Sequence, residues 1–197
     1  LVLAALTGAL SVRHARVYFA MVTLGISMVF YAWAEQAYSI TRGDNGIRLS
    51  RPSLFGVPLE SDLAYYYLAV LPVFAASVAL LWYLGRSPFG KVLQAVRDNP
   101  RRAEHVGIPV RRVRWMAFVL SGAFTGAAGA LLAPFVGHVT PQSLHVLKSA
   151  EIVVMTLLGG PTFFLGPLVG AGFYTFLEAY VRPAFYWQFL LGTALVA

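Results

Sequence analysis

The stretch LAYYYLAVLPVFAASVALLWYL, residues 63–84, decides the fold class of this chain. Its 22 residues include no Asp, Glu, Lys, Arg or His. At about 1.5 Å rise per residue, a helix of this length extends about 33 Å, which exceeds the roughly 30 Å hydrocarbon core of a bilayer. The stretch therefore predicts a helix that crosses a membrane.

Two further uncharged stretches lie on either side of it, residues 17–34 and residues 115–136, with 18 and 22 residues. The whole chain is 58% hydrophobic and only 12% charged, whereas soluble domains carry roughly 25% charged residues. The sequence has no long alternating β pattern, and an open sheet cannot lie in lipid. We therefore expect an all-α fold, a polytopic transmembrane helical bundle.

Shorter apolar segments complete the expected series of helices. We predict helices at 1–12, 17–34, 63–84, 115–136, 149–160, 165–181 and 184–197. The first and the last are too short to cross a membrane alone, so we expect both ends of the chain to be truncated spans. Together the helices are expected to form one transmembrane domain over residues 1–197.

Glycine and proline interrupt the later apolar segments, so the C-terminal part is expected to contain broken helices. The run Gly159-Gly160-Pro161 ends one helix, and Gly166-Pro167 begins the next. We interpret this as two short helices joined by a non-helical turn inside the membrane, a feature common along transport pathways. The alternative is one kinked span, and the sequence leaves open whether 149–167 spans the membrane or re-enters.

Basic residues orient the predicted spans. Residues 85–114 carry eight basic and two acidic residues, a net charge of +6 out of the chain's formal +7. Residues 35–62, expected to be a long turn-rich polar loop, carry a net charge of −1. Because cytoplasmic loops are enriched in Lys and Arg, we expect 85–114 inside the cell and 35–62 outside. The same reasoning explains the high pI without nucleic-acid binding.

The cytoplasmic loop 85–114 is predicted to begin with an amphipathic helix. Phe89, Val92, Leu93 and Val96 recur at i, i+3, i+4 and i+7, which places them on one helix face. We expect this apolar face to dock a cytoplasmic protein. The alternative is that the loop caps the bundle and holds phospholipid head groups.

A second short helix is predicted to follow in the same loop. Asp98 or Asn99 is suited to cap its N-terminus, and Pro100 is suited to its first position. Gly107 is a natural stop, because helices commonly end with a glycine in the left-handed conformation.

Small residues form stripes on two of the predicted helices. Gly122, Gly126 and Gly129 lie on one, and Gly166 and Gly170 lie on another. Glycines four residues apart allow two helix backbones to approach closely. We expect these glycines to serve helix packing or to line a pathway.

Catalytic and metal-binding patterns do not emerge from the sequence. Residues 85–92 match a phosphate-binding loop except at Val92, which replaces the Ser or Thr that binds magnesium, and they follow a helix, not a strand. The four histidines are scattered and the chain has no cysteine. We therefore expect neither ATP hydrolysis nor a cofactor or metal ion in this chain.

Carboxylates embedded in a membrane are often functional, so an intramembrane enzyme is an alternative interpretation of the chain. Its candidate groups are Glu35, Glu151 and Glu178. Glu178 is expected instead to pair with Arg182 near a helix end, since the two lie at i and i+4.

Taken in chain order, several segments resemble the permease subunits of branched-chain amino acid ABC importers, of the second-permease type. The resemblance to the ATPase-coupling loop of that family rests on Ala95, Arg97, Asp98, Asn99, Ala103, Gly107 and Ile108. The other matching segments are 16–24, 41–46, 118–131, 151–160 and 166–171. Two residues depart from the pattern: Arg42 stands where the family usually has a small residue, and Pro100 where it often has a helix former.

The resemblance implies a membrane-spanning transport subunit, not an enzyme, in the bacterial cytoplasmic (inner) membrane. Its implied partners are cytoplasmic ATPase subunits that use ATP, a second homologous permease subunit and an external substrate-binding protein. Its implied cargo is Leu, Ile or Val, with urea or short amides as the alternative. A passive channel is a further alternative with the same architecture.

Overall fold

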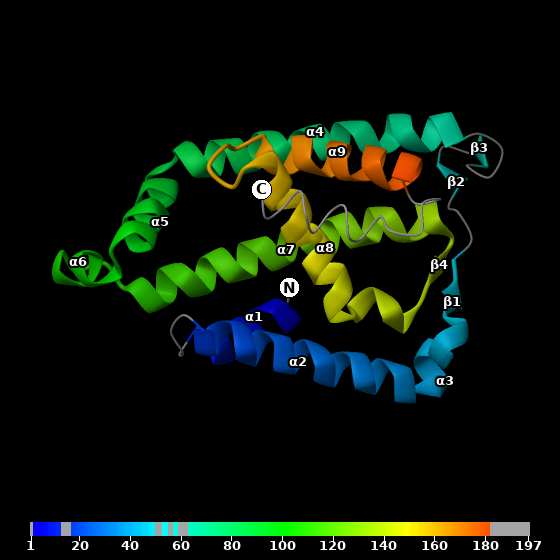
Figure 1. The fold of residues 1–197 in the computed structure, drawn as a ribbon, viewed down its shortest axis with the longest axis horizontal. Coiled ribbons are helices and arrows are strands. Elements are labelled where there is room, and N and C mark those ends of the chain that lie inside the picture. The colour runs from blue at the N-terminus through cyan, green and yellow to red at the C-terminus, as the bar shows by residue number, and fades with distance from the viewer. Residues whose placement is uncertain (1, 13–16, 50–52, 55–56, 59–62, 182–197) are drawn as a thin grey trace. The chain divides into compact units, whose positions relative to one another are not determined.

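The computed structural model describes residues 2–12, 17–49, 53–54, 57–58 and 63–181 (Figure 1). The chain divides into two compact units, Leu1–Leu144 and His145–Ala197. The predicted all-α class is confirmed, because helices account for most of the described residues and the strands are only two residues long. The predicted helix 184–197 and the partner Arg182 lie outside the described residues.

The first unit contains the long apolar helices. They are α2 (Val17–Gln36), α4 (Leu63–Arg86) and α7 (Val110–Val136), preceded by the shorter α1 (Val2–Ser11). Within the described ranges, α2, α4 and α7 are the helices long and apolar enough to cross a membrane. The prediction for α7 was wrong at its start, which lies at Val110 and not at residue 115. The basic residues there were expected to be loop, but they form the first turns of the helix.

Helix α1 packs along α7. The indole N–H of Trp115 donates a hydrogen bond to the carbonyl of Ala5 at 3.0 Å. Further along the interface, a Cβ placed on Gly122 would lie 2.4 Å from the Cβ of Ala4. Such a close approach requires glycine at position 122, as the small-residue spacing predicted for this helix.

The polar segment 35–62 has short regular elements in its described parts. It contains α3 (Tyr38–Thr41), the 3₁₀ turn η1 (Gly43–Asn45) and three two-residue strands, β1 (Ile47–Arg48), β2 (Ser53–Leu54) and β3 (Val57–Pro58). Strand β1 pairs antiparallel with β4 (His138–Val139), which directly follows α7. These short elements agree with the predicted turn-rich segment, and the β1–β4 pair brings it to the C-terminal end of α7.

This pairing places two distant parts of the sequence at the same end of the first unit. Ile47 pairs with Val139, and the N–H of Leu49 donates to the carbonyl of Gly137 at 3.0 Å. The next turn, η2 (Pro141–Leu144), reaches α2, where the Ser27 hydroxyl donates to the Leu144 carbonyl at 3.4 Å. Because β1 and β4 lie at the same end, this arrangement agrees with a chain that crosses the membrane an even number of times between these two strands.

Arg42, which departs from the family pattern, has an unusual backbone. Its φ is +59°, the single positive φ of a non-glycine residue among those described. A side chain with a Cβ is disfavoured in this left-handed region. Glycine, which has no Cβ, would be the least strained residue at this position.

The described part of the second unit, up to residue 181, contains the helices α8 (Val146–Gly159) and α9 (Gly166–Val181). A Cβ on Gly159 would lie 1.7 Å from the carbonyl oxygen of Gly166, and one on Gly170 would lie 1.9 Å from that of Met155. The break predicted between Gly159-Gly160-Pro161 and Gly166-Pro167 is confirmed, because α8 ends at Gly159 and α9 begins at Gly166. The alternative of one kinked span is wrong, since α9 folds back onto α8. That the turn lies inside a membrane stays a prediction.

Candidate partner-docking site

The connection between α4 and α7 begins with a tight reversal into α5 (Pro88–Asp98). Ser87 caps the helix, since its side chain accepts a hydrogen bond from the N–H of Gly90 at 3.4 Å. A Cβ on Gly90 would lie 2.2 Å from the carbonyl oxygen of Gly85. Only glycine fits at position 90, so α5 can start directly against the end of α4.

A single residue, Asn99, joins α5 to the second short helix, α6 (Pro100–His105). Its backbone is extended, with φ −151° and ψ 97°. Its N–H donates to the carbonyl of Ala95 at 3.1 Å, and its side-chain oxygen accepts from the N–H of Arg102 at 3.1 Å. Asn99 therefore ends one helix and caps the next, as predicted for Asp98 or Asn99.

Gly107 ends α6 as predicted. Its φ is +86°, in the left-handed region that favours glycine. Its N–H donates to the Glu104 carbonyl at 2.9 Å, and the N–H of Ile108 donates to the Ala103 carbonyl at 3.0 Å. This pair of hydrogen bonds is a Schellman motif, which satisfies carbonyls at the helix end.

A buried cluster holds the connection together. Val96 of α5, Ala103 of α6, and Val110 and Val113 of α7 are each 4–7% exposed. Val92, Leu93 and Ile108 pack against them. Because α7 starts at Val110, its first turns bury Val96 of the apolar face 89–96, while Phe89, Val92 and Leu93 stay partly exposed. That this face docks a partner stays a prediction.

The outward surface of the connection is basic, and we call it the basic surface. Arg97 and Asp98 form an ion pair at 3.1 Å, with side chains 75% and 67% exposed. Val106 is 81% exposed at the turn before Gly107. The exposed basic residues are Lys91, Arg97, Arg101, Arg102, Arg111 and Arg112. A partner would meet positive charge here, with the side chain of Val106 as an apolar contact.

The seven residues predicted to form the coupling loop fall into two groups. Ala95, Arg97, Asp98, Asn99 and Gly107 are exposed, so a partner can reach them. Ala103 is buried in the cluster and Ile108 packs against it, so these two support the surface from inside. Their part in coupling stays a prediction.

The glycine stripes have unequal surroundings. Gly122 lies against α1, and Gly159, Gly166 and Gly170 lie in the α8–α9 contact. Gly160 has φ +86° in the turn that follows α8. Gly126 and Gly129, in contrast, have no atom of the described residues within 4 Å of the position that a Cβ would take. Their role in packing or in a pathway stays a prediction.

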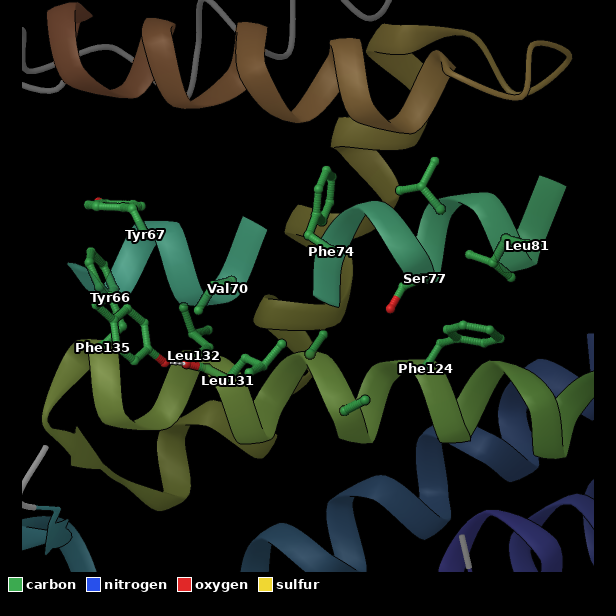
Figure 2. A pocket seen from close by; sticks show the side chains of 13 residues that line it. Tyr66, Tyr67, Val70, Phe74, Ser77, Leu81, Phe124, Leu131, Leu132 and Phe135 are labelled. Carbon is green, nitrogen blue, oxygen red and sulfur yellow. Dashed lines mark hydrogen bonds between the residues drawn. The ribbon is translucent and has the colours of Figure 1, made fainter. Parts of the chain in front are cut away.

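Sequence reasoning missed an apolar groove between α4 and α7, with a volume of about 460 Å³ (Figure 2). At one end the rings of Tyr66 and Phe135 stack at 6.1 Å, and the Tyr66 hydroxyl donates to the carbonyl of Leu131. The Ser77 hydroxyl donates to Val73 of its own helix at 2.8 Å. With those hydroxyl groups bonded to backbone, the groove offers mainly hydrocarbon to whatever covers it.

Other polar groups do not gather into a reactive centre in the described part of the chain. Glu151 pairs with Lys148 at 2.9 Å, and no group of His, Cys, Asp or Glu side chains there is arranged to hold a metal ion. His145 caps α8 by accepting from the N–H of Leu147 at 3.3 Å. Residues 85–92 connect two helices, which is not the strand-to-helix setting of a phosphate-binding loop.

Comparison with known proteins gives consistent matches. The family model described as "Branched-chain amino acid transport system / permease component" matches residues 1–197. The high-affinity branched-chain amino acid transport system permease protein LivM of Escherichia coli K12 is 30% identical over 166 residues, which cover 73% of this chain and 39% of LivM. The autoinducer 2 import system permease protein LsrC of Klebsiella pneumoniae is 32% identical over 184 residues, which cover 88% of this chain and 51% of LsrC.

The matched region spans about half, or less, of the length of these curated relatives. No solved structure matches the chain. Both relatives are permease proteins of transport systems, but the cargoes in their names differ. Import of autoinducer 2 was not among the alternatives considered from the sequence.

Proposed function

Because this chain belongs to the family of permease components of branched-chain amino acid transport systems, we propose that it is a membrane-spanning subunit of an ATP-driven importer. The importer would move branched-chain amino acids across the bacterial cytoplasmic membrane. Three apolar helices of sufficient length support a multi-pass membrane protein. ATP would be hydrolysed by separate cytoplasmic subunits, and a second homologous permease subunit and an external substrate-binding protein would complete the assembly.

The observation that carries this proposal is the construction of the α5–α6 connection. Its buried cluster, the two caps of Asn99 and the Schellman motif at Gly107 make it a stiff element fixed to both α4 and α7. A force applied to the basic surface would therefore be passed to two spans at once. Such an element suits the transmission of ATPase movement to the membrane.

The cargo is proposed from the relatives. LivM supports a branched-chain amino acid, and LsrC, with slightly higher identity and wider coverage, supports autoinducer 2 as the second candidate. Uptake of labelled leucine and of autoinducer 2 by the reconstituted complex separates the two, with urea as the third substrate. Saturable uptake of autoinducer 2 without leucine uptake would replace the first candidate by the second.

The coupling role is tested by two glycines with matched backbones. Gly107 and Gly137 have φ of +86° and +78°, and at neither of them would a Cβ have a neighbour within 4 Å among the described residues. Valine at either site should cost about 1–2 kcal/mol of backbone strain. We expect Gly107→Val to abolish uptake per inserted molecule, and Gly137→Val, at the opposite end of α7, to retain it.

A charge reversal provides the second arm of this test. Arg97→Glu should abolish uptake and should reduce the ATPase response to the loaded binding protein, while Arg48→Glu, exposed in β1, should leave both unchanged. Uptake is normalised to membrane-inserted protein. Wild-type specific uptake in both Gly107→Val and Arg97→Glu would rule out the docking role.

A further inference from the structure

An amphipathic pocket lies beside the basic surface, among the starts of α2 and α7, the end of α1, and α5. Its volume is about 470 Å³. The apolar part is formed by Val12 and Val96, which are buried, and by Phe19 and Phe118, which are half-buried. The two phenylalanine rings meet edge to face at 6.0 Å.

Two arginines line the same pocket. Arg97 reaches it from α5 and Arg114 from α7. The Arg97 side chain is 75% exposed and its Nε is paired with Asp98, which leaves its terminal nitrogens available. Arg114 is half-buried, and it forms no ion pair with any residue that the structure describes. The pocket thus combines a cationic rim with an apolar floor.

The position of these residues along α7 matches a membrane interface. Arg114 is the last charged residue before the uncharged stretch 115–136. Phe118 lies four residues further along, about 6 Å deeper at 1.5 Å per residue. Trp115 lies between them, and tryptophan is enriched at the interface between water and lipid. Arg114 therefore lies at head-group depth and Phe118 at the depth of the first acyl carbons, and Arg97 and Phe19 line the same pocket.

We propose that this pocket binds an anionic phospholipid, with its phosphate between Arg97 and Arg114 and an acyl chain over Phe19 and Phe118. Guanidinium groups form charge-assisted hydrogen bonds with phosphate oxygens. A soluble anion would use the rim but not the floor, and an uncharged lipid would use the floor but not the rim. The inference rests on the membrane location of α2 and α7 and not on the transported cargo.

The test measures lipid binding by the intact purified permease with native mass spectrometry. The probes are palmitoyl-oleoyl phosphatidylglycerol and phosphatidylcholine with the same chains. We expect preferential binding of phosphatidylglycerol by the wild type. The double variant Arg97→Gln/Arg114→Gln should bind it roughly 10- to 30-fold more weakly, since each basic residue near an anionic surface contributes about 1 kcal/mol.

Matched variants separate the pocket from general charge and from misfolding. Arg101→Gln/Arg102→Gln removes the same charge from exposed positions outside the pocket and should bind like the wild type. Arg97→Lys/Arg114→Lys keeps the charge and should retain most of the binding. The proposal is overturned by equal weakening in the two Gln variants, by equal loss in the Lys and Gln variants of the pocket, or by full competition from glycerol phosphate.

Discussion

The α4–α7 connection buries Val96, Ala103, Val110 and Val113 within the chain, whereas an 18-residue window of α4 contains no residue that the chain buries. The two regions follow directly upon one another in sequence. The connection must exclude water from its apolar groups, so it folds around them. A span in lipid has no such need, because lipid tails are as apolar as its side chains.

This difference indicates where rigidity resides in the first unit. The connection carries its own caps and its own small core, so its shape depends little on what surrounds it. The spans depend on lipid or on further helices for their lateral contacts. The groove between α4 and α7 is the clearest example of apolar surface that this unit leaves uncovered.

If α4 and α7 cross the membrane, the connection and the β1–β4 pair must lie on opposite sides of it. Finding both on the same side would refute the contrast between a water-exposed connection and lipid-exposed spans. The chain has no cysteine, so single cysteines at Gln94, Asn45 and Gln142 can be labelled by an impermeant thiol reagent in intact cells. All three positions are exposed. We expect complete labelling from outside at Asn45 and Gln142 and none at Gln94. Labelling of Gln94 from outside would invert or refute the topology.

The next largest effect is expected at the reversal between α4 and α5. Gly90→Val would place a side chain against the backbone of Gly85, which cannot move without disturbing both helices. We expect a loss of about 3 kcal/mol or more in the free energy of unfolding. Gly85→Val is the control, because no atom in the described part of the chain lies within 4 Å of the position that its Cβ would take. Folded yield after detergent extraction and thermal unfolding provide the measurement, and equal losses in both variants would contradict the assigned contact.

A smaller effect distinguishes the cluster from the span residue by residue. Val96→Ala should lower the free energy of unfolding by about 1–3 kcal/mol, because it opens a cavity among buried neighbours. Leu80→Ala, at a position in α4 that is 50% exposed, should change it by less than about 0.5 kcal/mol. Thermal unfolding of the two purified variants compares them directly. An equal cost at Leu80 would mean that other helices cover α4 in the intact assembly.

The local features of the connection were predictable from sequence because their signals are local. Asn99, Pro100 and Gly107 specify a cap, a first helical position and a stop within a few residues of chain. Where the apolar face of α5 packs was not predictable from such local signals. The spans were delimited by the absence of charge, which hid the fact that α7 begins at Val110 and includes Arg111, Arg112 and Arg114.

Contacts between distant segments were predicted less well for a related reason. Glycine spacing indicated that backbones approach closely at Gly166 and Gly170, but it did not say that α9 folds back onto α8. The groove between α4 and α7 depends on how these two helices lie side by side. The sequence of either helix alone does not encode that placement. The strands of segment 35–62 are too short to show a period.

The antiparallel pair of β1 and β4 has a consequence for the order of assembly. Its two strands are separated in sequence by α4, the capped connection and α7. Since chains are synthesised from the N-terminus, β1 leaves the ribosome long before its partner. Closing so long a loop is entropically costly until the intervening helices are in place. The pairing of Ile47 with Val139 is therefore expected to form late, so it would complete this end of the first unit only after the helices between the two strands are in place.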